Sequence, residues 1–405
     1  MDVSSKEERT FKFFLLSRAS RSVALIFVTL SLPLYLFALH YNIISIGIIY
    51  FVIMVFNAGL SVLLGALGDR VGYKKSLIIG EIFPLVALIL LASSINFFVI
   101  VIAATIGGIA GVAGGMRGTF SPGSTALIVS NWKDNKERVK KLAATTYVGS
   151  AFAIFGSLML YFKSFFANSV GVINSFRILF GLSAAMVLIS LLALIFVSEV
   201  KRPKKTTRIM KKESIRYSLK VIIANSFNGF GLGVALPLLP LWFELRFNTG
   251  SGVIGIMYTV SYAATALAAF VASKRAYSSK FSTLVTASYT RTLLGVMLLA
   301  IAFSPLFIIA SVFFTFRSFI AGFGSPSRSA VNMTGVNSQD YGTASSFIGL
   351  ANRLSQTSSG LSGYLMDVSP PFPVIIGGVL QFIGGFVYFK VLSSKKVISG
   401  KGTKI

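Results

Sequence analysis

The residues best suited to chemistry in this chain are a few charges that interrupt long apolar runs. Arg117, Arg291, Arg317 and Arg353 each lie inside such a run, while Glu81 is the one acid at comparable depth. A guanidinium presents a planar fork of donors that matches carboxylate or phosphate, and the match is strongest where water is excluded. The excess of arginine over acid therefore predicts recognition of an anionic group.

The same inventory of residues excludes several classes of enzyme. The chain has no cysteine and a single histidine, His40, so thiol nucleophiles and Cys/His zinc or redox sites lack their usual groups. No strand pattern precedes the glycine-rich segments, as a phosphate-binding loop would require. We therefore expect no catalytic residues, no metal and no cofactor.

Long apolar helices must position these charges. Of the 405 residues, 54% are hydrophobic and 12% are charged, whereas soluble domains carry about 25% charged residues. A bilayer core about 30 Å thick needs about 20 apolar residues per helix, and lipid admits only segments that satisfy their own backbone. The sequence thus predicts an all-α membrane protein with about twelve transmembrane helices. These lie near 22–42, 45–68, 76–95, 97–127, 142–162, 175–198, 217–243, 252–273, 282–303, 306–336, 343–366 and 373–392.

Basic residues between the apolar runs predict the orientation of the chain. Clusters of Lys and Arg precede the first run and follow the second, fourth, sixth, eighth and last runs, whereas only Lys163, Arg177 and Arg246 lie on the opposite side. The clustered side is cytoplasmic by the positive-inside rule. We therefore expect a multi-pass protein of the cell membrane with both termini in the cytoplasm. The net charge of +26 is then an orientation signal and not a sign of nucleic-acid binding.

The sequence also repeats itself at a constant spacing of 204 residues. The tripeptide Leu-Pro-Leu at 32–34 recurs at 236–238, and Ser-Pro at 121–122 recurs at 325–326. Internal repeats of this kind are common in transporter folds. They predict two pseudo-symmetric six-helix bundles, residues 1–198 and 217–405, joined by a basic cytoplasmic linker at 199–216.

The loop after the second run carries a motif. Residues 65–75 read Gly-Ala-Leu-Gly-Asp-Arg-Val-Gly-Tyr-Lys-Lys. This segment resembles the signature of the major facilitator superfamily, G-x-L-x-D-R-x-G-R-[KR]-[KR], and departs from it at Tyr73, where arginine is common. Together with the twelve predicted spans and the two-fold repeat, the resemblance covers the whole chain.

The residues of this loop have physical roles of their own. Gly65 would permit close packing of helices, Gly72 would permit a tight turn, and Asp69 could meet a neighbouring helix N-terminus or an arginine. The resemblance implies that the loop is a latch for the outward-facing state, and we carry that role onto Gly65, Asp69, Arg70 and Gly72. The second-half copy of the loop has Ser273 in place of the acid, so a symmetrical latch is not expected.

The resemblance further implies two bundles that rock about a central site, lined by the first, fourth, seventh and tenth helices. Arg353 is the leading substrate-binding candidate, because its span is rich in small polar residues that include Gln356. Arg317 and Arg117 lie about one turn apart when the halves are aligned, so they form a quasi-equivalent pair. In the family, an arginine in the fourth helix commonly supports the signature acid, which gives Arg117 a second interpretation as part of the latch.

Several further residues complete the predicted site. Tyr35 and Asn228 are expected to line the cavity, with simple packing as the alternative for the tyrosine. Arg291 falls in a scaffold helix by the family's arrangement, which favours a structural role. Glu81 either carries a proton or pairs with a neighbouring arginine or with Lys75.

The outer ends of the first and seventh runs carry a further pair. His40 and Glu244 occupy equivalent positions there. They form either a gate or proton relay, or simply interfacial polar groups.

These features favour a secondary active transporter that moves a small solute by alternating access, since no nucleotide-binding motif is present. The arginine excess favours a small organic anion, with proton symport as an open alternative for the energy source. The competing hypothesis is proton-coupled efflux of multidrug or hydrophobic compounds. It is disfavoured because residues 149–157 lack the proline of the G-P-x-x-G-G motif of such antiporters. One chain carries both halves, so a monomer would suffice.

Overall fold

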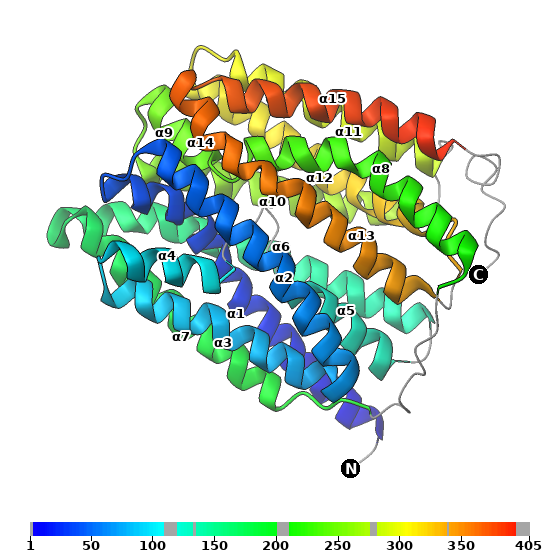
Figure 1. The fold of residues 1–405 in the computed structure, drawn as a ribbon. Coiled ribbons are helices and arrows are strands. Elements are labelled where there is room, and N and C mark those ends of the chain that lie inside the picture. Colours follow the sequence, from blue (N-terminus) through cyan, green and yellow to red (C-terminus); the bar gives the residue numbers. More distant parts are fainter. Residues whose placement is uncertain are drawn as a thin grey trace. The chain divides into compact units, whose positions relative to one another are not determined.

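The computed structural model describes residues 3–108, 120–132, 135–200, 210–275, 282–337 and 340–393. Within these ranges the regular structure is helical, and no strand is present (Figure 1). The apolar composition of the predicted runs explains why they are helical. In lipid, a helix satisfies the hydrogen bonds of every backbone group within its own segment. The prediction of an all-α membrane protein is confirmed.

The first half of the chain forms seven helical segments in which α1, α6 and α7 pack together and α3 packs on α7. Their bounds are α1 Val3–Ala38, α2 Ile43–Val71, α3 Tyr73–Ser93, α4 Phe97–Ile106, α5 Phe120–Asn131, α6 Asn135–Val170 and α7 Val172–Ile195. Aromatic side chains fill the contact between α1 and α7, where Phe27 and Tyr35 lie against the ring of Phe180.

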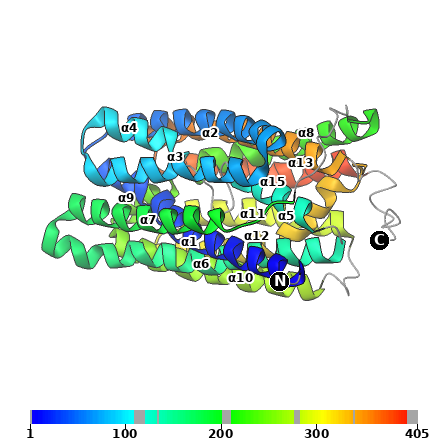
Figure 2. The same ribbon diagram turned by 90° about the horizontal axis from the view of Figure 1, so that it is seen from below.

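The second half is built around α15, which packs along α8 and α11, while α11 also packs on α12 (Figures 1 and 2). The bounds are α8 Lys212–Ala235, α9 Leu239–Phe247, α10 Ser251–Arg275, α11 Thr283–Ala302, α12 Phe307–Met333, α13 Tyr341–Ser355, η2 Gln356–Ser358, α14 Ser359–Val368 and α15 Phe372–Leu392. Glycines in α15 allow the close approach: a Cβ at Gly378 would lie 2.9 Å from the side chain of Leu299.

Nine helices in the described ranges are long and apolar enough to cross a membrane, or ten if the bent pair α8 and α9 is one span. The bend of 48° follows Pro237, which lacks the donor needed to continue the helix. The predicted fourth span comprises α4 and α5, and its middle, 109–119, lies outside the described residues. The predicted eleventh span is divided by the 3-10 turn η2.

Helix α1 extends well before residue 22, the expected start of the first span. The helix from Glu7 to Ala38 contains an apolar window long enough to cross a membrane, and Arg18 and Arg21, which we expected in the cytoplasmic segment before the span, are 1% and 3% exposed inside the helix. The charge of Arg21 is compensated within the helix bundle by the carboxylate of Glu81 on α3, as described below.

Contacts divide the chain into two units, residues 1–206 with 249–259, and residues 207–248 with 260–405. The change of unit at 206–207 falls within the segment 199–216. Helix α8 begins within that segment, at Lys212. We call the two the N-terminal and C-terminal units.

Candidate functional site

The junction of α2 and α3 is built on Gly72, as the motif predicts for a tight turn. Gly72 has φ of +106° and ends α2 while it begins α3. A side chain would be strained in this conformation, and a Cβ would lie 2.8 Å from Oε2 of Glu199. Only glycine suits this position.

An acid that the motif does not contain binds the N-terminus of α3. Glu199 accepts hydrogen bonds from the backbone N–H groups of Tyr73 at 2.8 Å and of Lys74 at 2.9 Å. The Lys74 ammonium in turn donates to the carbonyl of Ile195 at 2.6 Å. The carboxylate neutralises the positive end of the α3 dipole and ties the end of α7 to the motif.

Asp69 has a different partner from those expected for it. The phenol of Tyr73 donates to Oδ1 of Asp69 at 2.6 Å, so the residue that departs from the family signature contacts the signature acid. Arg70 is exposed in the last turn of α2. Among the described residues, a Cβ at Gly65 would meet no heavy atom within 4 Å, so the close helix packing expected there is not seen in them, whereas a Cβ at Gly68 would lie 2.7 Å from the Tyr73 ring.

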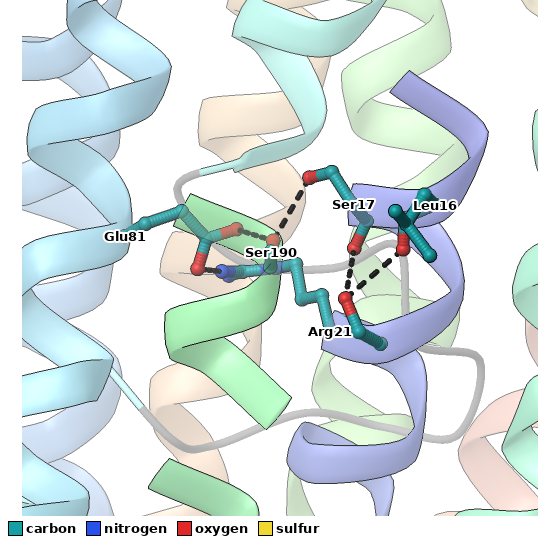
Figure 3. A network of polar contacts seen from close by, with 6 residues as sticks. Leu16, Ser17, Arg21, Glu81 and Ser190 are labelled. Atoms are coloured by element: carbon teal, nitrogen blue, oxygen red, sulfur yellow. Dashed lines mark hydrogen bonds and ion pairs between the residues drawn. The ribbon is translucent and has the colours of Figure 1, made fainter. Parts of the chain in front are cut away.

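Glu81 lies in a buried polar network between α1, α3 and α7 (Figure 3). The Nη1 of Arg21 and Oε2 of Glu81 are 2.5 Å apart, and the Ser190 hydroxyl donates to Oε1 at 3.0 Å. The hydroxyls of Ser17 and Ser190 are 2.8 Å apart and extend the network to α1. Of the partners considered for Glu81, the structure shows the arginine.

A second arginine lies one turn earlier on α1, and a glycine of α6 makes room for it. A Cβ at Gly149 would lie 2.5 Å from Nη2 of Arg18. Gly149 is the first residue of the segment 149–157, which lacks the proline of the antiporter motif. In this chain that segment accommodates a guanidinium.

Tyr35 lies within the core of the N-terminal unit. Its ring makes edge contacts with Phe176 and Phe180 at centroid distances of 5.6 and 5.2 Å, and its side chain is fully buried. These contacts correspond to the packing alternative. Its role in the substrate site stays a prediction.

Two buried arginines of the C-terminal unit contact side chains of α15, Gln381 and Tyr388. Arg317 of α12 is 5% exposed, and its Nη2 donates to Oε1 of Gln381 at 3.2 Å. Arg291 of α11 is 4% exposed; its Nη2 donates to Oδ1 of Asn225 at 2.5 Å, and its guanidinium lies 4.0 Å from the centre of the Tyr388 ring. No local sequence pattern indicates this second cluster, although Asn225 lies one repeat spacing after Arg21.

Arg353 and Gln356 flank the break between α13 and α14. Arg353 is partly buried in the last turn of α13, and Gln356 begins η2. The small polar residues around them turn towards α8: the Ser358 hydroxyl donates to the carbonyl of Phe230 at 2.8 Å, and a Cβ at Gly229 would lie 2.7 Å from Cβ of Ser355. This face therefore packs on another helix, α8.

The remaining candidates occupy less enclosed positions. Asn228 is partly buried on α8, where its backbone lies close to Gly384 of α15. His40 is exposed in a left-handed turn after α1, with φ of +63°, and Glu244 is partly buried in α9. Arg117 lies outside the described residues. The gating and binding roles of these residues stay predictions.

Comparison with known proteins agrees with this architecture. The family model described as Major Facilitator Superfamily matches residues 14–220. No curated protein sequence matches the chain.

Solved structures with the same fold cover nearly the whole chain. The D-xylose-proton symporter has a TM-score of 0.72 at 16% identity and covers 100% of both chains. An auto-inhibited peptide transporter of the POT family has a TM-score of 0.74 at 12% identity, with 95% of this chain and 96% of that chain covered. The human organic anion transporter MFSD10 (TETRAN) has a TM-score of 0.62 at 16% identity, with 94% and 99% covered. The chain is a member of the major facilitator superfamily.

Proposed function

We propose that this secondary transporter carries a small organic anion by alternating access. The observation that carries the proposal is the placement of charge in the C-terminal unit. Arg291 and Arg317 lie near the middle of α11 and α12 and are almost fully buried. A charge at mid-membrane costs about 2.5–3.5 kcal/mol on insertion scales, so such residues are functional candidates.

The acids of this unit are placed differently. Residues 207–405 contain Glu213, Glu244, Asp340 and Asp367. Glu213 is in the first turn of α8, and Asp340 immediately precedes α13. Asp367 is the penultimate residue of α14, and Glu244 lies in the short helix α9. Positive charge is therefore deep in the unit and negative charge is near helix ends, an arrangement suited to an anionic solute.

Arg353 is proposed as the substrate-binding arginine, with Arg317 and Gln356 in support. It is less buried than Arg291 or Arg317 and lies beside the break at η2, where the helix is interrupted. Interrupted helices supply binding groups in many transporters. The organic anion transporter among the solved structures shares the fold, which is compatible with this assignment.

Proton symport is proposed as the energy source, with Glu81 as the candidate carrier. Protonation of Glu81 would remove the charge that holds Arg21, so proton binding would loosen α1 from α3. The structurally similar D-xylose-proton symporter supports a proton-coupled mechanism as the first model to test.

The test is transport by the purified protein in liposomes. Counterflow of radiolabelled small carboxylates, such as lactate and succinate, should be saturable. Arg353→Gln should lower it about tenfold to a hundredfold, because one charge-assisted hydrogen bond contributes about 1.5–3 kcal/mol. Arg246→Gln is the matched control, since Arg246 is an exposed arginine in α9 of the same unit.

Other outcomes would redirect the assignment. Transport of lipophilic cations alone, unchanged in Arg353→Gln, would refute the anion proposal and support the efflux alternative. Carboxylate uptake that does not respond to an imposed pH gradient would refute proton symport while leaving the anion proposal intact.

A further inference from the structure

The cluster around Arg291 contains more hydrogen-bond donors than acceptors. Nη2 of Arg291 is bonded to Oδ1 of Asn225, but Nε and Nη1 of Arg291 and Nδ2 of Asn225 have no hydrogen-bond partner in the described ranges. Both side chains are buried, at 4% and 2% exposure. A buried donor without an acceptor costs about 1–3 kcal/mol, and more when it is charged. Three such donors on two contacting side chains indicate a missing acceptor.

The ring of Tyr388 packs against the Arg291 guanidinium. The Tyr388 ring covers one face of the guanidinium at 4.0 Å, and its hydroxyl donates to Oδ1 of Asn332 at 2.8 Å. The aromatic face stabilises the cation but cannot accept from the in-plane N–H groups in the way an anion can. The cation–π contact therefore leaves the donors of Arg291 unsatisfied.

The helices around the cluster approach each other closely. One turn before Tyr388, a Cβ at Gly384 would lie 3.2 Å from the backbone nitrogen of Asn228 on α8, and one at Gly385 would lie 3.0 Å from the carbonyl of Ser288 on α11. The hydroxyl of Ser288, one turn from Arg291, also has no partner in this part of the chain. Such close packing suits a small acceptor better than a large solute.

The buried arginine cluster of the N-terminal unit contains the acceptor that this one lacks. Arg21 and Asn225 are equivalent at the repeat spacing of 204 residues. In the N-terminal unit Arg21 of α1 meets the carboxylate of Glu81 on α3. In the C-terminal unit Asn225 of α8 meets Arg291 of α11. Here the guanidinium is on α11, its partner is a neutral amide, and the residue one repeat spacing after Glu81 is Val285.

We propose that the cluster of Arg291, Asn225 and Ser288 binds one small monovalent anion, which would accept from Arg291 as the Glu81 carboxylate accepts from Arg21 in the N-terminal unit. The anion would be a halide such as chloride or the carboxylate of a small acid such as acetate. It would be a resident structural ligand of the α8–α11–α15 contact. The proposal does not depend on which solute is transported, because occupancy is measured without transport.

The experiment is thermal unfolding of the purified full chain in detergent, in sodium chloride, acetate or gluconate at equal ionic strength. Gluconate serves as the large anion that the packed site should exclude. Chloride or acetate should raise Tm saturably, by about 2 °C at ten times the dissociation constant. The anion that raises Tm more, chloride or acetate, shows whether the cluster prefers a halide or a small carboxylate.

Two variants locate the effect. Arg291→Gln should abolish the dependence of Tm on the anion. Asn225→Asp should also abolish it while raising Tm in gluconate, because the new carboxylate supplies the missing acceptor beside Arg291. Arg246→Gln, an exposed arginine of the same unit, should respond to anions like the parent.

Equal Tm values in the three salts would overturn the proposal. They would indicate that water, and not an anion, accepts hydrogen bonds from Arg291 and Asn225. An anion response that persists in Arg291→Gln would place the bound anion elsewhere, which also contradicts the proposal. If Arg291→Gln does not fold, crystals of the parent grown with bromide give a direct test. Anomalous density beside the Arg291 guanidinium would support the site, and its absence at full bromide substitution would refute it.

Discussion

At the scale of single residues, the Arg21–Glu81 pair is a buried charged contact that joins α1 to α3 in the N-terminal unit. Glu81 is fully buried and Arg21 nearly so. Removing one partner of a buried pair leaves an uncompensated charge in a medium that cannot solvate it. The shape of the amide in glutamine is similar to that of the carboxylate, so Glu81→Gln isolates the loss of charge.

We expect Glu81→Gln to lower the stability of the protein by about 3–5 kcal/mol, measured as the shift of the thermal unfolding transition in detergent. The control is Glu8→Gln, because Glu8 and Lys12 form an ion pair whose side chains are 66% and 73% exposed. Exposed pairs contribute little, so its Tm should match that of the parent. Equal Tm values for the two variants would show that the buried pair does not stabilise the fold.

At the scale of helical elements, the α2–α3 junction separates two glycines of the same motif. Gly72 adopts φ of +106° beside Glu199, while Gly65 lies inside α2 with open space around it. The motif makes them look alike, but the backbone requires glycine only at the first. Their substitution by alanine should therefore change stability in opposite directions.

Gly72→Ala should destabilise the protein by about 1–3 kcal/mol through backbone strain, and more if Glu199 is displaced from α3. Gly65→Ala should stabilise it by about 0.5–1 kcal/mol, because alanine loses less backbone entropy than glycine in a helix. Thermal unfolding of both variants provides the measurement. A Gly65→Ala protein that is stable but does not transport would show that Gly65 serves the latch in another conformation, as the family resemblance implies.

The same elements show what a sequence can and cannot predict. The helices between loops follow from apolar length alone, and α11 and α15 begin and end within one residue of the predicted spans. The start of α1 was missed because Arg18 and Arg21 look like the end of an apolar run. Arg21 is paired inside the bundle with Glu81, which is 60 positions away in the sequence. Long-range partners of this kind leave no local pattern.

The candidate site shows the same limit. The turn at Gly72 was predictable from a local motif, because a left-handed conformation restricts the residue type at one position. The N-terminal partner of α3 was not, since Glu199 follows α7 and shares no pattern with residues 65–75. The Arg291–Asn225 contact was also missed, because an amide gives no signal of charge. Only its equivalence to Arg21 across the repeat marks it.

At the scale of the whole molecule, the order of crossings determines which residues face each compartment. The basic clusters predict that the loop after α5 is cytoplasmic, and that the loops after α3 and α9 are external. Two of these assignments depend on interrupted spans. The segment from α4 to α5 must cross once, and the bent pair α8–α9 must also cross once.

The absence of cysteine from the sequence makes these crossings directly testable, because any introduced thiol is the only one present. We expect Ile95→Cys and Asn248→Cys to react with a membrane-impermeant maleimide in right-side-out vesicles, and Lys140→Cys to react only in inverted vesicles. All three positions are exposed. The unsubstituted protein is the background control. If Ile95→Cys and Lys140→Cys react from the same side, residues 97–131 do not cross the membrane. If Asn248→Cys reacts from the cytoplasmic side, the α8–α9 pair is re-entrant, and Arg353 would lose its predicted place in a two-bundle transporter.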